Sequence, residues 1–463
     1  MKVETPGTRG LSVTEKILTM VQKGDDAQSP SAYDYYVVGI LALIYMFSTI
    51  DRTLISVLAE PIKEEFALSD GQIGLLTGAA FAISYSAAGI PLGMLADRLV
   101  RVRLLASLVS VWSFLTVASS LATGWVTLAL ARVGVAAAES GASPAAMSLI
   151  TDYFGKERRG FAMSLFYVST PLGVAISFVL GGYLASLHGW RSVFVYAGLP
   201  GLILAGLVLF TIAEPKRGQK DAAETKISDD IRAEADKQKK SHVREAFNII
   251  MGTPAILLLI LAAASVVVAQ ASLSAFMAPF FIRFHDMDIA QAGLTIGLAK
   301  GITGVIGIVV GGIVADRLAK VSMSGSPRVV GLLMILAAPF AITAFIVSDW
   351  RVAIAFVAAY NILNYTYYGA TFATYMTIAP AKLRGVLGAI LAVALNIVGY
   401  GFGPPLAGLT SDLLAGFGIA DHLRWALVIT SIFFAIAGIL YIATSQAIRR
   451  VESRNSEPVG FAA

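Results

Sequence analysis

The sequence predicts an all-α membrane protein whose twelve transmembrane helices form two pseudo-symmetric six-helix bundles. Of its 463 residues, 57% are hydrophobic and only 14% are charged, with a mean hydropathy of +0.75. A soluble domain is about 25% charged. The chain also contains about twelve apolar stretches of the length that spans a bilayer as a helix, roughly 20 residues. A charged segment near the middle separates six stretches from the other six.

The expected spans follow one another with short polar connections. They are residues 34–59, 71–96, 103–122, 125–153, 159–187, 191–213, 253–282, 288–316, 327–347, 350–378, 383–411 and 424–448. The resulting domains are a tail (1–33), an N-terminal bundle (34–213), a charged linker (214–252), a C-terminal bundle (253–450) and a second tail (451–463).

The distribution of Lys and Arg predicts the orientation, because cytoplasmic loops carry an excess of these residues. Of the 35 basic residues, 27 lie in the N-terminal tail and in every second segment after it, 5 lie in the opposite loops, and 3 lie within expected helices. We therefore expect both termini and the linker in the cytoplasm. The net charge of +5 then reflects topology, and nucleic acid is not an expected partner.

The two halves of the chain repeat one another. Gly93-Met-Leu-Ala-Asp97-Arg98-Leu-Val-Arg101 ends the second span, and Gly312-Ile-Val-Ala-Asp316-Arg317-Leu-Ala-Lys320 ends the eighth, 219 residues later. Arg159-Gly160 and Arg384-Gly385 open the fifth and eleventh spans, 225 residues apart. Similar offsets at two places indicate a duplicated six-helix unit. Parallel repeats of this kind place a substrate site between the halves, near the bilayer midplane.

The repeated Gly-x-x-x-Asp-Arg-x-x-Arg motif resembles the signature loop of the major facilitator superfamily. Further residues resemble its Spinster branch. These are Asp51-Arg52, the segment from Arg132 to Ser140 with Glu139, and the segment from Thr151 to Gly160. Ala138 stands where that branch usually has glycine. Spinster proteins transport lysolipids and sphingoid lipids in eukaryotes, and bacterial relatives are thought to be proton-driven.

The resemblance implies a monomeric transporter of a bacterial inner membrane, working by alternating access. Its partners would be protons, the bilayer and an amphipathic small molecule or lipid. The proton gradient would supply energy, with no cofactor and no metal. The alternative within this class is a proton-coupled symporter of small organic anions.

Other classes of protein fit the residues less well. There is no cysteine, and the four histidines fall in expected loops or at helix ends. A membrane-embedded enzyme would need a nucleophile–base pair or a metal cluster at membrane depth. A channel would need rings of repeated residues around a pore. Walker motifs are absent from the sequence, so ATP is not the expected energy source.

The loop motif is interpreted as a conformational latch. A carboxylate at Asp97 would be stabilised by the positive N-terminal end of a neighbouring helix, which the resemblance identifies as the eleventh, beginning near Leu383. Arg98 or Arg101 would pair with Asp152, and these contacts would exist only while the cytoplasmic side is closed. The other members of the expected latch are Gly93, Arg159, Gly312, Asp316, Arg317 and Lys320.

Five charged residues lie deep within expected spans: Asp51, Arg52, Arg132, Glu139 and Lys300. Ionisable groups at this depth are costly and mark functional sites by default. Their roles are the main question that the sequence raises.

Asp51, Arg132 and Glu139 are predicted to handle protons. Arg132 and Glu139 lie about 10 Å apart along one helix face, but Arg132 leans away from Glu139 because helical side chains point toward the N-terminus. Asp51 is expected at the depth of Arg132. Burial favours a neutral carboxylic acid and a nearby arginine favours the ionised form. We hypothesise that Glu139 and Asp51 exchange protons, with Arg132 as the switching partner; a permanent structural ion pair is the alternative.

Two further cations are assigned to the substrate. Arg52 points about 100° around the helix from Asp51, so it either anchors an anionic headgroup or pairs with a neighbouring helix. Lys300 either holds a phosphate or carboxylate, reaches the other bundle, or is neutral. The remaining expected substrate contacts are Asn364, Tyr368, Thr371, Phe276 and Tyr167. Such a mixed wall suits an amphipathic, lipid-like anion, although any one of these residues could instead join helices by hydrogen bonds.

Overall fold

The computed structural model describes residues 30–217, 244–319 and 324–456. The N-terminal bundle is built from the following helices in chain order: α2 (Ala32–Val57), α3 (Ala59–Phe66), α4 (Asp70–Thr77), α5 (Ala79–Arg98), α6 (Arg101–Ser119), α7 (Trp125–Glu139), α8 (Ala142–Tyr153), α9 (Lys156–Tyr167), α10 (Ser169–His188) and α11 (Trp190–Thr211).

The C-terminal bundle follows the same plan. Its helices are α13 (Pro254–Ala275), α14 (Met277–His285), α15 (Ile289–Ala319), α16 (Gly325–Ile346), α17 (Trp350–Tyr365), α18 (Tyr367–Ile378), the short η1 (Ala381–Leu383), α19 (Arg384–Ala394), the π-helical turn η2 (Leu395–Tyr400), α20 (Gly401–Gly416) and α21 (His422–Ser456).

Ten helical stretches within the described ranges are long and apolar enough to cross a membrane. The spans expected at 125–153 and 350–378 are both divided. The first breaks between α7 and α8 at Ser140-Gly141, and the second breaks between α17 and α18 at Thr366. Each half is too short to cross by itself, but the two halves follow one another across the bundle. The predicted all-α membrane fold is confirmed.

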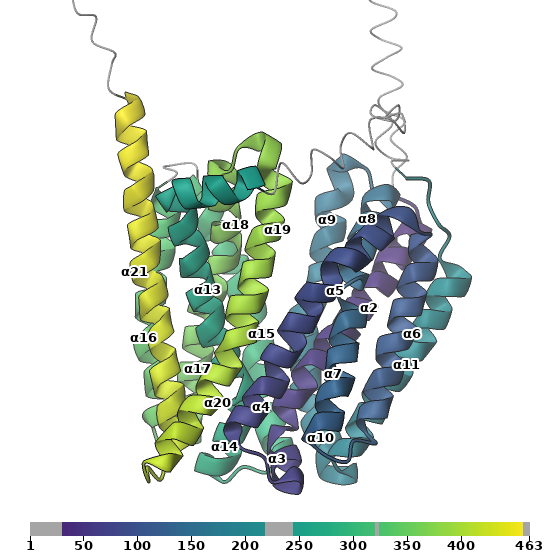
Figure 1. Ribbon diagram of the computed structural model, residues 1–463, viewed down its shortest axis with the longest axis vertical. Helices are drawn as coiled ribbons and strands as arrows, with labels where there is room; N and C mark the ends of the chain where they lie inside the picture. The colour runs from purple at the N-terminus through teal and green to yellow at the C-terminus, as the bar shows by residue number, and fades with distance from the viewer. Residues whose placement is uncertain (1–29, 218–243, 320–323, 457–463) are drawn as a thin grey trace, which may run out of the picture.

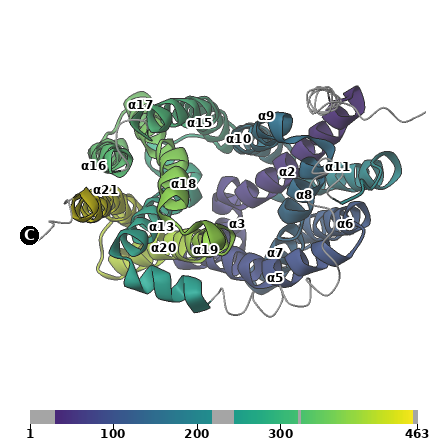
Figure 2. The ribbon, with the colours of Figure 1, turned by 90° about the horizontal axis from the view of Figure 1, so that it is seen from above.

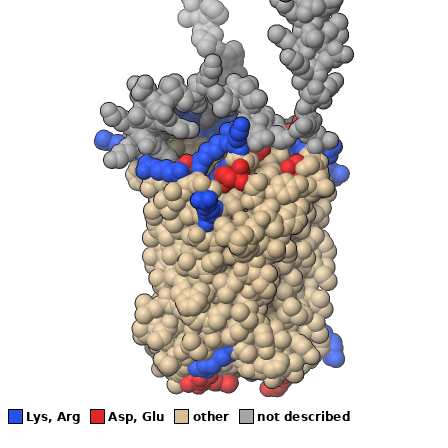
Figure 3. All heavy atoms as spheres, turned by 90° about the vertical axis from the view of Figure 1, so that its right-hand side faces the viewer, with Lys and Arg blue, Asp and Glu red and all other residues tan. Residues whose placement is uncertain are grey.

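The two bundles stand side by side (Figures 1 and 2). We call the end where α2 begins and α21 ends the linker end, which is the upper end in Figure 1, and the other the far end. On the face shown in Figure 3, charged side chains gather at or near these two ends and leave the middle uncharged. That distribution is expected of a surface in contact with lipid.

The bundles touch closely toward the far end. A Cβ added to Gly293 on α15 would lie 2.3 Å from the carbonyl oxygen of Phe178 on α10, and one added to Gly182 would lie 2.5 Å from that of Ile289. Backbones can approach so closely only where there is no side chain. At the linker end, by contrast, a Cβ at Gly93 or Gly385 would meet nothing within 4 Å. The bundles are therefore packed at the far end and separated at the linker end.

Gly293→Ala should lower the stability of this conformation, because the added methyl group meets backbone that cannot move aside. We expect a loss of about 1–3 kcal/mol, the usual cost of overpacking, measured by thermal unfolding of the purified protein. Gly206→Ala is the matched control, since a Cβ there meets nothing within 4 Å. Equal unfolding temperatures for the two variants would contradict the close approach of α10 and α15.

Candidate functional site

The first buried ion pair joins α2 to α7. Arg132 Nη1 lies 3.1 Å from Asp51 Oδ2, and the two side chains are 1% and 4% exposed. Thr116 donates a hydrogen bond to Asp51 Oδ1 at 2.9 Å, and Arg132 Nη2 donates to Ser119 Oγ at 3.1 Å. The guanidinium also lies over the ring of Phe194, 5.3 Å from its centroid. Both charges are thus held by several partners, as buried ions require.

The second pair lies one residue further along α2. Arg52 Nε donates to Glu139 Oε2 at 2.8 Å, and Ser48 donates to the same oxygen at 2.9 Å. The Glu139 side chain is fully buried, whereas that of Arg52 is 33% exposed. The Arg52 guanidinium lies over the rings of Phe81 and Tyr85, at 4.9 and 4.5 Å from their centroids. Arg52 therefore joins the buried carboxylate to a more open, aromatic surface.

The expected meeting of Asp51 with Arg132 is confirmed as a contact. In this conformation the cation at Glu139 is Arg52 rather than Arg132, and the role of Arg132 as a switching partner stays a prediction. The reason is the lean of helical side chains toward the N-terminus, which takes Arg132 away from Glu139. Glu139 Oε1 is buried, and none of the described residues forms a hydrogen bond with it.

A small pocket, with room for about one water molecule, reaches this second pair from within the N-terminal bundle. Ser48 and Arg52 on α2, together with Glu139, line one part of it, and Ser143 and Ala146 on α8 line another. Because α8 continues from there to the linker end, the cavity lies on the linker side of Glu139. A proton acceptor at Glu139 therefore has an internal space beside it, lined in part by hydroxyl groups.

Lys300 is the charged residue that the sequence placed deep in the C-terminal bundle. Its residue surface is 8% exposed. Its ammonium group donates a hydrogen bond to Ser274 Oγ on α13 and lies 5.6 Å from the centroid of Phe178 in the other bundle. One turn along α15, Thr303 accepts a hydrogen bond of 2.6 Å from Asn361 on α17. Lys300 thus lies where α13, α15 and α10 meet.

The other expected substrate contacts are dispersed. Tyr167 is 45% exposed, and Tyr368 is half-buried and stacks near Tyr365. Asn364 is fully buried, with no hydrogen-bond partner for its amide among the described residues. In this conformation two residues belong to the interior of the C-terminal bundle: Phe276, which is fully buried, and Thr371, whose hydroxyl lies 2.5 Å from that of Tyr441. Their contact with substrate stays a prediction.

The expected latch is only partly assembled. Arg101 pairs with Asp152 of the same bundle and with Glu214, the first residue after it. Asp97 and Arg98 are exposed, and no hydrogen bond or ion pair joins either of them to another described residue. Because Arg101 and Asp152 lie in one bundle and pair while the linker end is separated, our expectation that this contact requires closure is wrong.

The remaining latch residues add little in this conformation. Arg159 donates a hydrogen bond of 2.7 Å to the carbonyl oxygen of Thr151, and Arg317 is exposed. Lys320 lies outside the described residues; Gly312 and Asp316 lie on α15, in a part of it whose side chains the structure does not describe.

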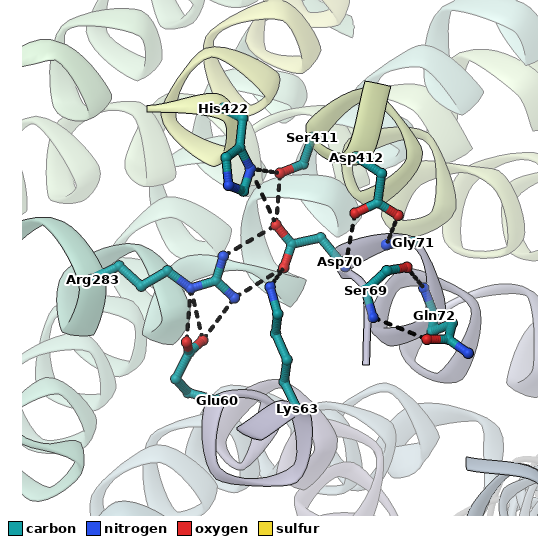
Figure 4. A network of polar contacts seen from close by, with 10 residues as sticks. All are labelled: Glu60, Lys63, Ser69, Asp70, Gly71, Gln72, Arg283, Ser411, Asp412 and His422. Atoms are coloured by element: carbon teal, nitrogen blue, oxygen red, sulfur yellow. Dashed lines mark hydrogen bonds and ion pairs between the residues drawn. The ribbon is translucent and has the colours of Figure 1, made fainter. Parts of the chain in front are cut away.

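The far end carries an ionic network that the sequence reasoning missed (Figure 4). Asp70, fully buried at the start of α4, accepts from Lys63 at 2.5 Å and from Arg283 of the other bundle at 2.9 Å. Arg283 also donates to Glu60 at 2.8 Å. Burial lowers the pKa of Arg283, but its hydrogen bonds to the two carboxylates outweigh this and raise that pKa above the usual range. Ser411 donates to Asp70 at 2.6 Å from the C-terminal bundle.

A second contact between the bundles at the far end is a helix cap. Asp412 on α20 accepts hydrogen bonds from the backbone N–H groups of Asp70 at 3.0 Å and Gly71 at 2.8 Å (Figure 4). These are free donors at the N-terminus of α4, where a negative charge is favourable. The sequence signal was the helix-start pattern Ser69-Asp70-Gly71-Gln72, but nothing in it pointed to a partner some 340 residues away.

The residues 41–398 match the profile of the Major Facilitator Superfamily. The chain belongs to that superfamily. A superfamily efflux pump of Mycolicibacterium smegmatis is 30% identical over 414 residues, which cover 89% of this chain and 93% of that protein. The sphingosine-1-phosphate transporter SPNS2 of Danio rerio is 24% identical over 436 residues, covering 88% and 83%. A Bacillus subtilis protein described as "Probable galactarate/D-glucarate transporter GudP" is 25% identical over 453 residues, covering 91% and 94%.

Among solved structures, a bacterial homologue of the lysosomal transporter Spinster, in an inward-facing and unoccupied conformation, superposes with a TM-score of 0.79. It is 28% identical, and the match covers 91% of this chain and 99% of that one. The predicted superfamily and Spinster-type resemblance are confirmed, and this superfamily member is a transporter rather than an enzyme. It is an integral, multi-pass membrane protein.

The Asp51–Arg132 pair predicts a non-additive loss of stability. Arg132→Met leaves Asp51 buried without its cation, so we expect a cost of about 3–5 kcal/mol. Asp51→Asn combined with Arg132→Met should restore part of that loss, because no uncompensated charge remains. Thermal unfolding of the single and double variants measures this, with Arg351→Met, at an exposed arginine, as the control. Strictly additive losses would contradict the pairing.

Proposed function

We propose that this protein is a proton-coupled secondary transporter of an amphipathic anion, working by alternating access. The observation that carries the proposal is the Arg52–Glu139 pair. One partner is fully buried, the other is 33% exposed, and the two link α2 to the end of α7. The pair lies within the N-terminal bundle beside a small pocket, and the two bundles of the protein are packed together at one end only.

Charge compensation couples the proton to the substrate. The Arg52 guanidinium needs a negative partner, because an uncompensated charge in a low-dielectric site is unfavourable. An ionised Glu139 supplies it in the empty transporter. When Glu139 takes a proton, Arg52 is released and can hold an anionic group of the substrate. Protonation and anion binding then favour one another, as coupling between two ligands requires. Asp51, held by Arg132, is the second acceptor in this proposal.

Alternating access would exchange contacts at the two ends. The far-end network and the Asp412 cap stabilise the conformation described here, in which the linker end is separated. In the alternative conformation, Asp97 at the end of α5 would cap the helix that begins at Arg384, α19. The second and eleventh spans would then cap one another, at the far end in one conformation and at the linker end in the other. A ligand shifts such an equilibrium only by binding the two states differently, which the release of Arg52 would supply.

The surface around Arg52 supports an amphipathic substrate. Tyr45 and Tyr85 approach the guanidinium from the N-terminal bundle, and Tyr365, Tyr368 and Tyr400 lie near one another in or beside the C-terminal bundle. Tyrosines offer an apolar ring and a polar hydroxyl. The sphingosine-1-phosphate transporter among the relatives is consistent with a lipid-like anion.

The second candidate is a symporter of small organic anions. It is favoured by the same pair of cations, Arg52 and Lys300, and by the sugar-acid transporter among the relatives. The same proton coupling would serve either substrate.

Glu139→Gln should abolish coupling, because the neutral amide can neither take up nor lose a proton and leaves Arg52 without its ion-pair partner throughout the cycle. In proteoliposomes we expect accumulation driven by a pH gradient to fall at least tenfold, while exchange of substrate without a gradient persists. Asp51→Asn should weaken gradient-driven transport in the same assay. The panel contains lysolipids, sphingosine-1-phosphate and galactarate, with Asp421→Asn as the control at a half-exposed carboxylate outside the site. Full gradient-driven transport by both site variants would overturn proton coupling at these residues.

Asp412→Ala should shift the conformational equilibrium toward closure of the linker end, because it removes the two hydrogen bonds by which Asp412 caps α4. The sequence contains no cysteine, so spin labels can be placed at Arg103→Cys and Lys382→Cys, two exposed positions at the linker end in different bundles. We expect a larger population with short label–label distances than in the unsubstituted background.

Asp421→Ala is the control for this measurement, since Asp421 pairs with Arg424 of its own bundle at the same end. An unchanged distance distribution for Asp412→Ala would show that the cap does not hold the far end closed.

A further inference from the structure

Lys300 is a buried cation whose surroundings supply few partners. Its ammonium group carries three N–H donors, and Ser274 Oγ accepts one of them. Among the described residues, no carboxylate lies within ion-pairing distance of it. The other cations at this depth, Arg52 and Arg132, both hold a carboxylate. Lys300 is therefore the one of these three that the described part of the chain leaves uncompensated.

The neighbourhood of Lys300 is polar without being acidic. Gln270 precedes Ser274 by one turn of α13, and its side-chain oxygen is buried with no hydrogen-bond partner among the described residues. Thr303 and Asn361 form their hydrogen bond one turn from Lys300. Thr303 also donates to the carbonyl oxygen of Ala299, and the Gln270 oxygen is itself an acceptor. The donors still available are the remaining N–H groups of Lys300, which an oxyanion would satisfy by charge and hydrogen bonds and an apolar ligand would not.

The position of Lys300 makes it a contact between bundles. Phe178 of α10 covers the ammonium group from the N-terminal bundle, with the ring centroid 5.6 Å away. The same two helices approach closely at Gly293 and Gly182. Separating α10 from α15 at the far end would uncover the ammonium group and admit water or an anion. Lys300 is thus occluded in this conformation and would become accessible in the opposite one.

We propose that Lys300 and Ser274 form an oxyanion subsite in the C-terminal bundle, which takes a carboxylate or phosphate group of the transported molecule. This subsite rests on the proposed function and adds to it a substrate class. Arg52 in the N-terminal bundle and Lys300 in the C-terminal bundle both serve the cargo, which therefore carries at least one oxyanion and two where both cations are engaged. Sphingosine-1-phosphate and galactarate are the two probes that separate the phosphate source from the carboxylate source.

The test compares Lys300→Met with the wild-type protein in lipid nanodiscs and in proteoliposomes. Methionine keeps the length of the side chain and removes the charge. Without a probe, we expect an unfolding temperature equal to or above that of wild type, because an uncompensated charge has been removed. The stabilisation by the probe should disappear, and the KM for the transported probe should rise at least tenfold. Lys382→Met, at an exposed lysine, is the matched control.

Lys300→Arg tests the charge itself and should recover part of the probe-induced stabilisation. A purely structural role predicts the opposite pattern: a lower unfolding temperature for Lys300→Met and undiminished stabilisation by the probe. That pattern, or the failure of both probes to bind the wild-type protein, would overturn the subsite.

The outcome is separable from proton coupling. Wild-type transport that does not depend on the pH gradient would refute the coupling at Glu139. A raised KM in Lys300→Met would still support the subsite. Conversely, intact gradient dependence with an unchanged KM in Lys300→Met would refute the subsite and leave the coupling standing.

Discussion

The structure depends on the requirement that a charge at membrane depth has a partner. Asp51 and Arg52 are adjacent and of opposite sign, yet they do not compensate one another, because successive helical residues point about 100° apart. Each instead takes a partner from the fourth span: Asp51 takes Arg132, and Arg52 takes Glu139. These two bonds fix the rotation and the depth of the first helix against the fourth. A change in the charge of Glu139 therefore acts directly on the first helix, through Arg52.

The same requirement shapes the interface between the bundles, which is packed toward the far end. Glycines on α10 and α15 let the two backbones meet there without polar groups. The far end is closed by charge, with buried Asp70 receiving two cations and with Asp412 satisfying the backbone of α4. Ionic contacts at a water-exposed end can be replaced by hydration when they break, whereas contacts in hydrocarbon have no such substitute. The far end is thus the part of the interface that can open at modest cost.

Much of this fold could be predicted from the sequence, because the length of an apolar run and the depth of a residue along it are local properties. Depth alone was enough to bring Asp51 and Arg132 together. The Arg52–Glu139 pair depends on how two helices are rotated about their axes, and one sequence does not contain that angle. The role of Asp412 could not be predicted for another reason, since its partners are backbone groups of a distant segment. Arg101 and Asp152 were wrongly read as a state-dependent contact, although both belong to one bundle and move together.

The charges themselves limit what the transporter carries. Among the five residues that lie deep in the spans, Asp51, Arg52, Arg132 and Glu139 cancel, and Lys300 leaves one positive charge. A cargo with one negative charge would balance Lys300 while Glu139 stays ionised and bound to Arg52. A cargo with a second negative charge would need Arg52 as well, and Arg52 becomes free only when Glu139 is protonated. In the mechanism proposed above, proton coupling is therefore a consequence of carrying the second charge, and the charge on the cargo would set whether a proton accompanies it.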